Sequence, residues 1–300
     1  DAITNVAFGN GLFAATSSVG DILTSADGLS WTKHTGKVIG ATSGLVFTGT
    51  KFIAMGFGAY YVSTDGTTWT AVADSTGAGR WGVLSIANDG AFVVGIGSEF
   101  IISSSDLTNW DIQQWSWGDE LHAVASRGDL FVAVGGAVGG NPTIMTSQGG
   151  KRWRVRSASI NGGATLHGAV DSGSRFVAVG NRGTIVKSDD GISWSSANSG
   201  TTQHLYGVTY GRSTFVAVGA GGKILTSSDG QSWTSRMSPT SSVLSGVTYS
   251  AARSLFIAVG GFGKIVTSPD GANWTSRSSG TTGILTAVVA GPSAIVAVGL

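Results

Sequence analysis

Three side chains that can hold a ligand recur at one place in a repeated pattern. His122, His167 and Tyr206 each follow a leucine, and about 40 residues separate one from the next. Imidazole nitrogens can ligate zinc, but only two histidines occupy this position and no carboxylate shares their register. We therefore predict no metal site, and interpret the three side chains as the polar lining of a channel that binds water or a ligand.

A second cluster lies in the segment QQWSWGDELH. Three of the ten tryptophans stand outside the repeated motif described below, at Trp81, Trp115 and Trp117. The ring of Trp117 is suited to stacking on a sugar. Polar groups that can bind sugar hydroxyls follow it at Asp119, Glu120 and His122. The alternative is that tryptophans in this segment cover the exposed edge of a strand.

Residues that could catalyse a reaction are scarce in this sequence. The chain has no cysteine, which excludes disulfides and thiolate chemistry, and it has two glutamates, Glu99 and Glu120. Hydrolysis of a polysaccharide generally needs two carboxylates about 5–10 Å apart, and outside the repeated motif only Asp119 and Glu120 cluster. No nucleophile elbow, phosphate loop or metalloprotease motif occurs. An enzyme is left open but is not favoured, and no cofactor is predicted.

The elements that position these residues follow from an internal repeat. A box of the form Ser-x-Asp-Gly-x-x-Trp, or a variant of it, recurs about every 40 residues and ends at Trp31, Trp69, Trp110, Trp153, Trp194, Trp233 and Trp274. Each unit contains four short β-rich runs between turn residues, and no stretch has a sustained helical period. Because a unit of about 40 residues with four antiparallel strands is typical of a propeller blade, we predict an all-β propeller.

The box itself predicts a turn between the third and fourth strands of each blade. Its Ser and Asp side chains can accept hydrogen bonds from the N–H groups of the turn, and its Gly supplies a positive φ. Its Trp is large enough to fill the seam between two blades. In the fourth copy Gly149 replaces the aspartate, which predicts a looser turn there.

The box resembles the Asp-box repeat of bacterial neuraminidase-type propellers, although the usual form has one more residue between the Asp and the Gly. That family includes sialidases, xyloglucanases, photosystem assembly factors and receptor ectodomains, so the resemblance implies a fold rather than an activity. It also implies a structural role for the box aspartates, because the box usually lies away from the catalytic face. The arginine triad and the Tyr–Glu pair of sialidase catalysis cannot be placed in this sequence.

The repeats span the chain, so we predict a single domain, residues 1–300. Repeats are predicted at about 3–36, 37–77, 78–117, 118–162, 163–202, 203–242 and 243–283, with a half-repeat at 284–300. Both ends of the chain therefore offer the same first two strands. We predict seven four-stranded blades with an unusual overlap where the ring closes; eight blades, or a segment of a longer array, is the alternative.

The composition limits the kinds of partner that the protein is expected to bind. Glycine accounts for 48 residues, charged residues for 12%, and the net charge is +1, so no overall field attracts nucleic acid. The longest apolar stretch, Leu285–Leu300, is shorter than the roughly 20 residues of a membrane span, so no membrane insertion is predicted. A local basic stripe, at Arg152, Arg154 and Arg156, either protects a strand edge or docks a partner.

Together these features predict a non-catalytic binding propeller, extracellular or associated with a bacterial or viral surface, that recognises a glycan. The predicted ligand-binding residues are Trp117, Asp119, Glu120, His122, His167 and Tyr206. A structural or protein-interaction module of a virion or cell-surface assembly, with a surface protein as its partner, is the first alternative. A glycan-processing hydrolase or lyase is the second, and the oligomeric state is left open.

Overall fold

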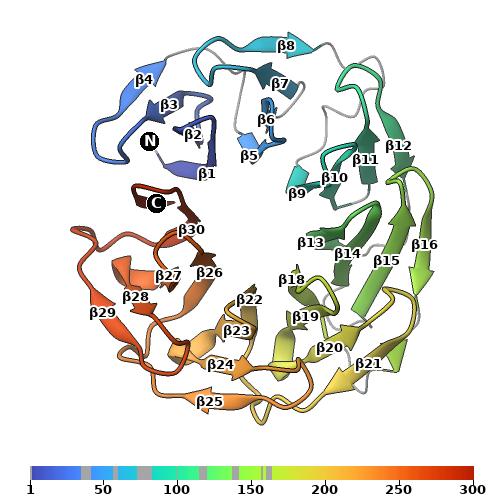
Figure 1. The fold of residues 1–300 in the computed structure, drawn as a ribbon, viewed down its shortest axis with the longest axis vertical. Coiled ribbons are helices and arrows are strands. Elements are labelled where there is room, and N and C mark those ends of the chain that lie inside the picture. The colour runs from blue at the N-terminus through green and yellow to red at the C-terminus, as the bar shows by residue number, and fades with distance from the viewer. Residues whose placement is uncertain are drawn as a thin grey trace.

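A computed structural model describes residues 2–34, 42–56, 60–72, 83–98, 100–114, 120–136, 142–156, 158–159 and 164–300. These residues form antiparallel sheets arranged in a ring about a central axis (Figure 1). Six of the sheets are four-stranded blades in which each strand pairs with the next in sequence, and a seventh blade has the same four strands with a short fifth strand at its outer edge. The predicted all-β propeller with seven four-stranded blades is confirmed.

The strands of each blade run from the central axis outward in chain order. Blades one and two comprise β1 (Ile3–Gly9), β2 (Leu12–Ser17), β3 (Ile22–Ser25), β4 (Thr32–His34), and β5 (Thr42–Phe47), β6 (Phe52–Gly56), β7 (Tyr60–Ser63), β8 (Thr70–Val72). Blades three and four comprise β9 (Val83–Asn88), β10 (Val93–Gly97), β11 (Phe100–Ser104), β12 (Asp111–Gln114), and β13 (Glu120–Arg127), β14 (Leu130–Gly136), β15 (Pro142–Gln148), β16 (Trp153–Arg156).

Blades five to seven repeat this arrangement with a short 3-10 turn between the second and third strands. They comprise β18 (Leu166–Asp171), β19 (Phe176–Gly180), η2 (Asn181–Gly183), β20 (Ile185–Ser188), β21 (Trp194–Ala197); β22 (Leu205–Gly211), β23 (Thr214–Gly219), η3 (Ala220–Gly222), β24 (Ile224–Ser227), β25 (Thr234–Arg236); and β26 (Leu244–Ser250), β27 (Leu255–Gly260), η4 (Gly261–Gly263), β28 (Ile265–Ser268), β29 (Thr275–Arg277). A two-residue strand, β17 (Ala158–Ser159), adds to the outer edge of blade five in parallel with β21.

The overlap at the ring closure is an extra hairpin. β30 (Leu285–Ala290) and β31 (Ile295–Gly299) pair with each other as a two-stranded sheet, and β30 packs beside both β26 and β1. In Figure 1 this hairpin, labelled at β30, lies between the first and the seventh blade. Among the described strands, none from one end of the chain pairs with a strand from the other, so the blades at the closure are joined by side-chain packing.

The box turns have the hydrogen bonds that their residue types predict. In blade six, Ser227 Oγ accepts a bond from the Gly230 N–H, and Asp229 Oδ1 accepts bonds from the next two N–H groups, each at 2.8 Å. The Trp233 indole donates to the Gly230 carbonyl at 3.1 Å. Gly230 has a φ of +70°, and a Cβ there would lie 3.0 Å from Val177 of the preceding blade. The glycine therefore serves both the turn and the close approach of two blades.

In blade four the box keeps its tryptophan bond without the aspartate. Trp153 donates from its indole to the Gly150 carbonyl at 2.8 Å, and the N–H of Gly149 donates to the Asp129 carbonyl at 2.7 Å. Both glycines have positive φ, +70° and +68°. The Asp129 carbonyl of a neighbouring turn thus binds the Gly149 N–H, which is a different donor from the two N–H groups that a box aspartate accepts.

The hydrophobic core lies in the seams between blades. One cluster, for example, joins Val177 and Val179 of blade five to Leu205 and Phe215 of blade six, with Trp233 packed against it. Box tryptophans therefore pack where the sequence predicted, and Trp194, which is more buried than the other six, is 6% exposed. Among the described residues no helix is long and apolar enough to cross a membrane.

Candidate functional site

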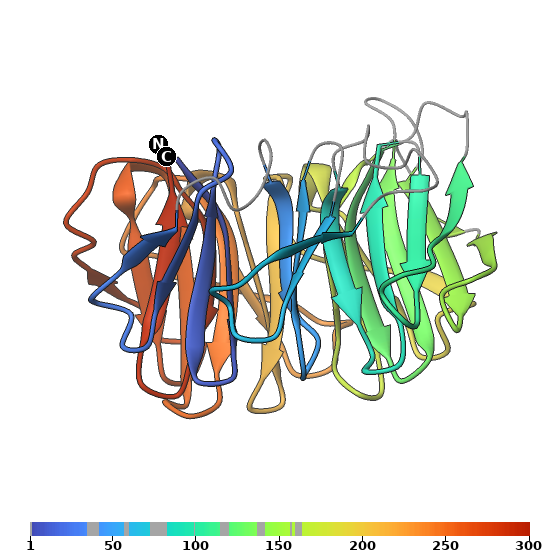
Figure 2. The ribbon, with the colours of Figure 1, turned by 90° about the horizontal axis from the view of Figure 1, so that it is seen from above.

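Alternating strand directions give the ring two distinct faces. We call the face at which the first strands begin and the second-to-third turns lie the entry face; the box turns lie on the opposite, box face. Both chain ends lie at the entry face, at the top of Figure 2. The first strands of adjacent blades pack side by side around the axis, as β13 does with β18 and β18 with β22. Side chains at their starts therefore gather at one end of the ring.

Every first strand carries a β-bulge near its start. Within each pair of first and second strands the register shifts by one residue, which leaves one residue of the first strand without a partner. The bulge residues are Thr4, Ser43, Leu84, His122, His167, Tyr206, Ser245 and Thr286. A bulge changes the direction in which a side chain leaves the strand. The residues singled out from the sequence at His122, His167 and Tyr206 are three consecutive members of this ring.

The three side chains form a row. The ring centroids of His122 and His167 are 5.3 Å apart, and those of His167 and Tyr206 are 5.6 Å apart. A fourth ring, His204, stacks beside Tyr206 at 6.3 Å, so three of the four histidines of the chain lie in one cluster. His122, His167 and Tyr206 are half-buried, whereas His204 is exposed.

Glycines permit this close spacing. The residue after the bulge is Gly168 in blade five, and a Cβ there would lie 3.2 Å from the carbonyl oxygen of Tyr206 in the next blade. Gly207 stands at the same place in blade six, where a Cβ would lie 3.4 Å from the Ser245 carbonyl oxygen. Gly168 and Gly207 thus leave room for the close approach of the next first strand, while in blade four Ala123 stands at this place.

Hydrogen bonds and burial set the state of the imidazoles. His167 Nε2 donates to Asn181 Oδ1 at 2.8 Å, which leaves its Nδ1 as an acceptor when the ring is neutral. The N–H of Arg182 donates to His204 Nδ1 at 3.3 Å. Burial lowers the pKa of His122 from its ordinary value of 6.5, and the neighbouring His167 lowers it further, while the carboxylate of Glu120 opposes both effects. The His122 ring is thus neutral near pH 7.

Of the other three predicted ligand residues, Glu120 alone is among the described residues. Glu120 begins β13 and is exposed beside the row. Trp117 and Asp119 lie outside the described residues. Among the described residues no group of three or more histidines or acidic residues is arranged to hold a metal ion.

Two further polar residues at the row, Asn181 and His204, were not identified from the sequence. A signal was present for His204, because it precedes Leu205 and so stands two residues before the bulge at Tyr206. Asn181 carried no such signal, since it reaches His167 only because η2 places the second-to-third turn of blade five over the first strand.

The acidic residues of blades five to seven all lie at the box face, where Arg175 pairs with Asp189. Residues 164–300 contain five aspartates and no glutamate, and each aspartate stands at the box-face end of a strand or in a turn there: Asp171, Asp189, Asp190, Asp229 and Asp270. The entry-face ends of the same blades carry only basic residues: Arg182, Lys223, Arg236, Lys264 and Arg277. The net charge of +1 thus conceals a cationic crescent on the entry face.

An apolar patch borders this crescent. Phe262 is 73% exposed in η4 with a φ of +56°, a conformation that non-glycine residues seldom adopt. Backbone bonds from Gly261 to the Val243 carbonyl and from Gly263 to the Gly283 carbonyl draw two linkers against this turn. Val243 and Ile284, both exposed apolar residues, lie in those linkers.

Comparisons with known proteins agree on the architecture. The profile of the DUF6242 beta propeller domain matches residues 105–246, a little under half of the chain. No curated protein matches the chain in sequence.

Several solved structures are similar over most of their length. The computationally designed protein Ika8 has a TM-score of 0.78 at 15% identity, covering 99% of this chain and 93% of its own. YCF48 bound to D1 peptide has a TM-score of 0.65 at 17% identity, covering 86% and 88%. The RRP9 WD40 repeats have a TM-score of 0.62 at 8% identity, covering 86% of each chain. Identities this low show the shared fold alone, and the chain is a β-propeller.

Proposed function

We propose that the chain is a non-catalytic binding module whose entry face recognises an extended protein segment rich in carboxylates and carrying an apolar anchor. The observation that carries the proposal is the confinement of the aspartates of blades five to seven to the box face, which leaves the basic groups of the entry face without nearby carboxylates. A one-sided field of this kind attracts and orients an anionic partner.

The neighbouring features suit the same ligand. The row formed by His122, His167 and Tyr206 offers half-buried ring surface at the start of the first strands. The patch around Phe262 offers exposed apolar surface on the same face. Large apolar or aromatic side chains at the centre of a binding surface, with charge at its margin, are typical of protein recognition.

The comparisons support a protein ligand without identifying it. One similar propeller, YCF48, is bound to a D1 peptide, and another consists of WD40 repeats. The bonds within the boxes also support our proposal that the chain belongs with the Asp-box propellers.

A peptide selection tests this function. Random peptides displayed on phage and selected on the protein should become enriched in Asp and Glu, and binding of the selected peptides should weaken as salt is raised. Arg182→Glu should reduce their affinity about tenfold. Arg212→Glu is the matched control, because Arg212 is also exposed with a positive φ but lies on the box face. No enrichment of acidic residues, or equal loss in both variants, would refute the proposal.

A glycan is the second candidate ligand. The half-buried faces of His167 and Tyr206 can stack on a sugar ring, and hydroxyl side chains stand at other bulges of the same ring, at Thr4, Ser245 and Thr286. With such a ligand the location we propose is extracellular or surface-associated. A glycan array probed with the protein and with Tyr206→Ala distinguishes this candidate, since a glycan site predicts a hit that the variant loses.

A further inference from the structure

The fourth box lacks an acceptor that the other six boxes share. In each of those six, one oxygen of the aspartate accepts the N–H groups of the two residues before the tryptophan, at 2.7–2.8 Å. The hydroxyl of the box serine donates to the same oxygen at 2.8–3.2 Å. Gly149 stands in the place of this aspartate in blade four, so its turn has no carboxylate to accept these bonds.

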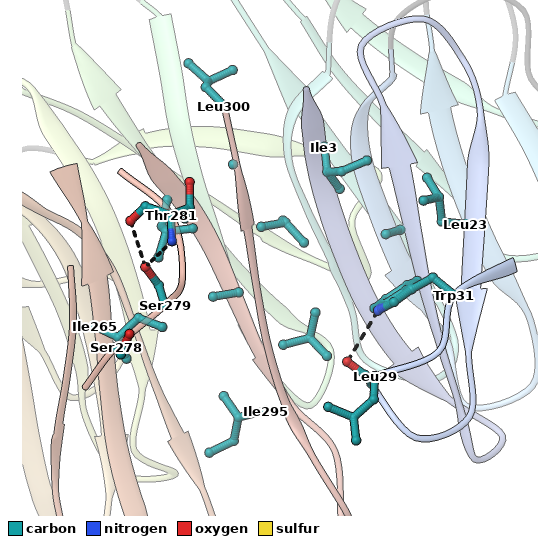
Figure 3. Close-up of a pocket in the computed structure, with 17 residues that line it drawn as sticks. Ile3, Leu23, Leu29, Trp31, Ile265, Ser278, Ser279, Thr281, Ile295 and Leu300 are labelled. Atoms are coloured by element: carbon teal, nitrogen blue, oxygen red, sulfur yellow. Dashed lines mark hydrogen bonds between the residues drawn. The ribbon is translucent and has the colours of Figure 1, made fainter. Parts of the chain in front are cut away.

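From Gly150 onward the fourth box keeps the geometry of the others. Its φ is +68°, against +70° at Gly230, and a Cβ at either glycine would lie 3.0 Å from a valine of the preceding blade. The Trp153 indole donates to the Gly150 carbonyl at 2.8 Å, and Figure 3 shows the equivalent bond of Trp31 as a dashed line. The two N–H groups between the glycine and the tryptophan therefore keep the places that they have in the other boxes.

The hydrogen-bond donors of this turn are unpaired. No described residue accepts a bond from the N–H groups of Gly150, Lys151 and Arg152. Ser147, the box serine, is 2% exposed, and its hydroxyl has no hydrogen-bond partner within the described parts of the chain. An unpaired buried polar group is uncommon in a folded protein and calls for a partner. The turn thus retains the donors of a box without their acceptor.

Basic side chains surround the unpaired donors. Lys151 and Arg152 occupy positions at which the other six boxes have only uncharged residues. Lys151 pairs with Asp111 at 3.3 Å, whereas Arg152 and Arg154 are exposed and form no ion pair with a carboxylate that the structure describes. Blade four has therefore lost a carboxylate and gained cations at one turn, and the resulting local positive field attracts an anion.

We propose that the fourth box binds a carboxylate of a partner protein, which takes the place that the box aspartate has in the other blades. A carboxylate is the ligand that these donors fit, because one carboxylate oxygen accepts the same two N–H groups in the other boxes. Hydrogen bonds to a charged acceptor are also stronger than neutral ones. Arg152 and Arg154 favour an acidic segment over a small free carboxylate, since they can pair with further carboxylates of the same segment. The site lies on the box face and does not depend on the function proposed for the entry face.

Acetate is the simplest probe of this site. In a titration with sodium acetate, followed by amide NMR and compared with sodium chloride at equal ionic strength, the amides of Lys151 and Arg152 should shift to saturation. Gly149→Asp supplies the carboxylate from within the chain, so the same amides should be shifted at the outset and should not respond to acetate. Asp229→Gly is the positive control, because it creates the same set of donors in blade six, where the corresponding amides should respond.

A polyglutamate peptide distinguishes a partner segment from a small carboxylate. Read at the amides of Lys151 and Arg152, its affinity should exceed that of acetate about tenfold. Arg152→Ser, which restores the serine of the first, fifth and sixth boxes, should remove that gain. Arg212→Ser is the matched control, since Arg212 is another exposed arginine of the box face and its loss should leave the affinity unchanged.

Two kinds of result contradict the proposal. A peptide that binds no more tightly than acetate would overturn the assignment of a protein partner. The site itself would be overturned by the lack of a saturable shift with either probe, by an equal shift from chloride, or by a response to acetate in Gly149→Asp. None of these outcomes bears on the entry face.

Discussion

His122 is held partly out of water beside a second imidazole, and both conditions disfavour its protonated form. We expect its pKa, followed by NMR of the ring protons, to lie below 6.5. His167→Gln should raise that pKa by removing the neighbouring imidazole that lowers it, and Glu120→Gln should lower it further. A pKa of His122 at or above the ordinary value would contradict the packing of the row.

The same shift has a consequence for stability. Since the folded state binds this proton less readily than the unfolded state, the contribution of His122 is constant above about pH 6.5 and destabilises the fold as the pH falls below that value. His122→Gln should therefore lose less stability than the wild type between pH 7 and the folded-state pKa. Denaturant melts at a series of pH values, compared between the two proteins, measure the difference.

A different pH dependence is expected for Asp229, whose stabilising effect depends on its charged form. Bonds from the backbone N–H groups of Ser232 and Gln231 and from the Ser227 hydroxyl lower its pKa from 3.8 to about 2. Its stabilising effect should be complete above pH 3.8 and be lost as the pH falls toward 2. At neutral pH Asp229→Ala should cost about 1 kcal/mol, as the loss of a side-chain cap does, and Asp229→Asn should cost less because an acceptor oxygen remains. Melting of Asp229→Ala at the wild-type midpoint would show that these bonds do not stabilise the turn.

At the scale of the element, the stability that a box tryptophan contributes should depend on how completely its surroundings bury it. Trp194 is 6% exposed in the seam with blade four, so Trp194→Ala should cost about 3–5 kcal/mol. Trp31 makes the same bond to its box glycine but lines a cavity beside the extra hairpin (Figure 3). Trp31→Ala should therefore cost clearly less. Equal destabilisation in denaturant melts would mean that the surrounding blade contributes little to the effect of the ring.

The strands themselves were predictable because they are short β-rich runs and the turns between them carry Gly, Asp and Ser. The bulges were not predicted. A signal for them exists in the glycines at Gly168, Gly207 and Gly246, which follow a bulge residue where the next first strand approaches closely. A glycine in a strand is compatible with either a bulge or a close contact, and here it accompanies both.

At the scale of the whole molecule, the half-blade closes the ring. Val296 and Val298 pack with Phe13 of the first blade, while Leu285 packs with Ile257 and Val259 of the seventh. Deletion of Leu285–Leu300 should therefore expose both neighbouring blades and lower the midpoint of denaturant unfolding for the entire domain. Unchanged unfolding would mean that the hairpin adds nothing to the stability of the ring.

The repeat in the sequence determined the all-β propeller, the number of complete blades and the turn chemistry of the boxes, because each depends on contacts within about 40 residues or between successive units. The repeat also places His122, His167 and Tyr206 at the same position of three successive units.

Tertiary structure decided what depends on the faces of the ring. The pairing of His167 with Asn181 and the confinement of the aspartates of blades five to seven to the box face follow from how strands of alternating direction stack around the axis. Residues distant in sequence share a face only once that stacking is known, and therefore the cationic crescent was not visible in a composition with a net charge of +1.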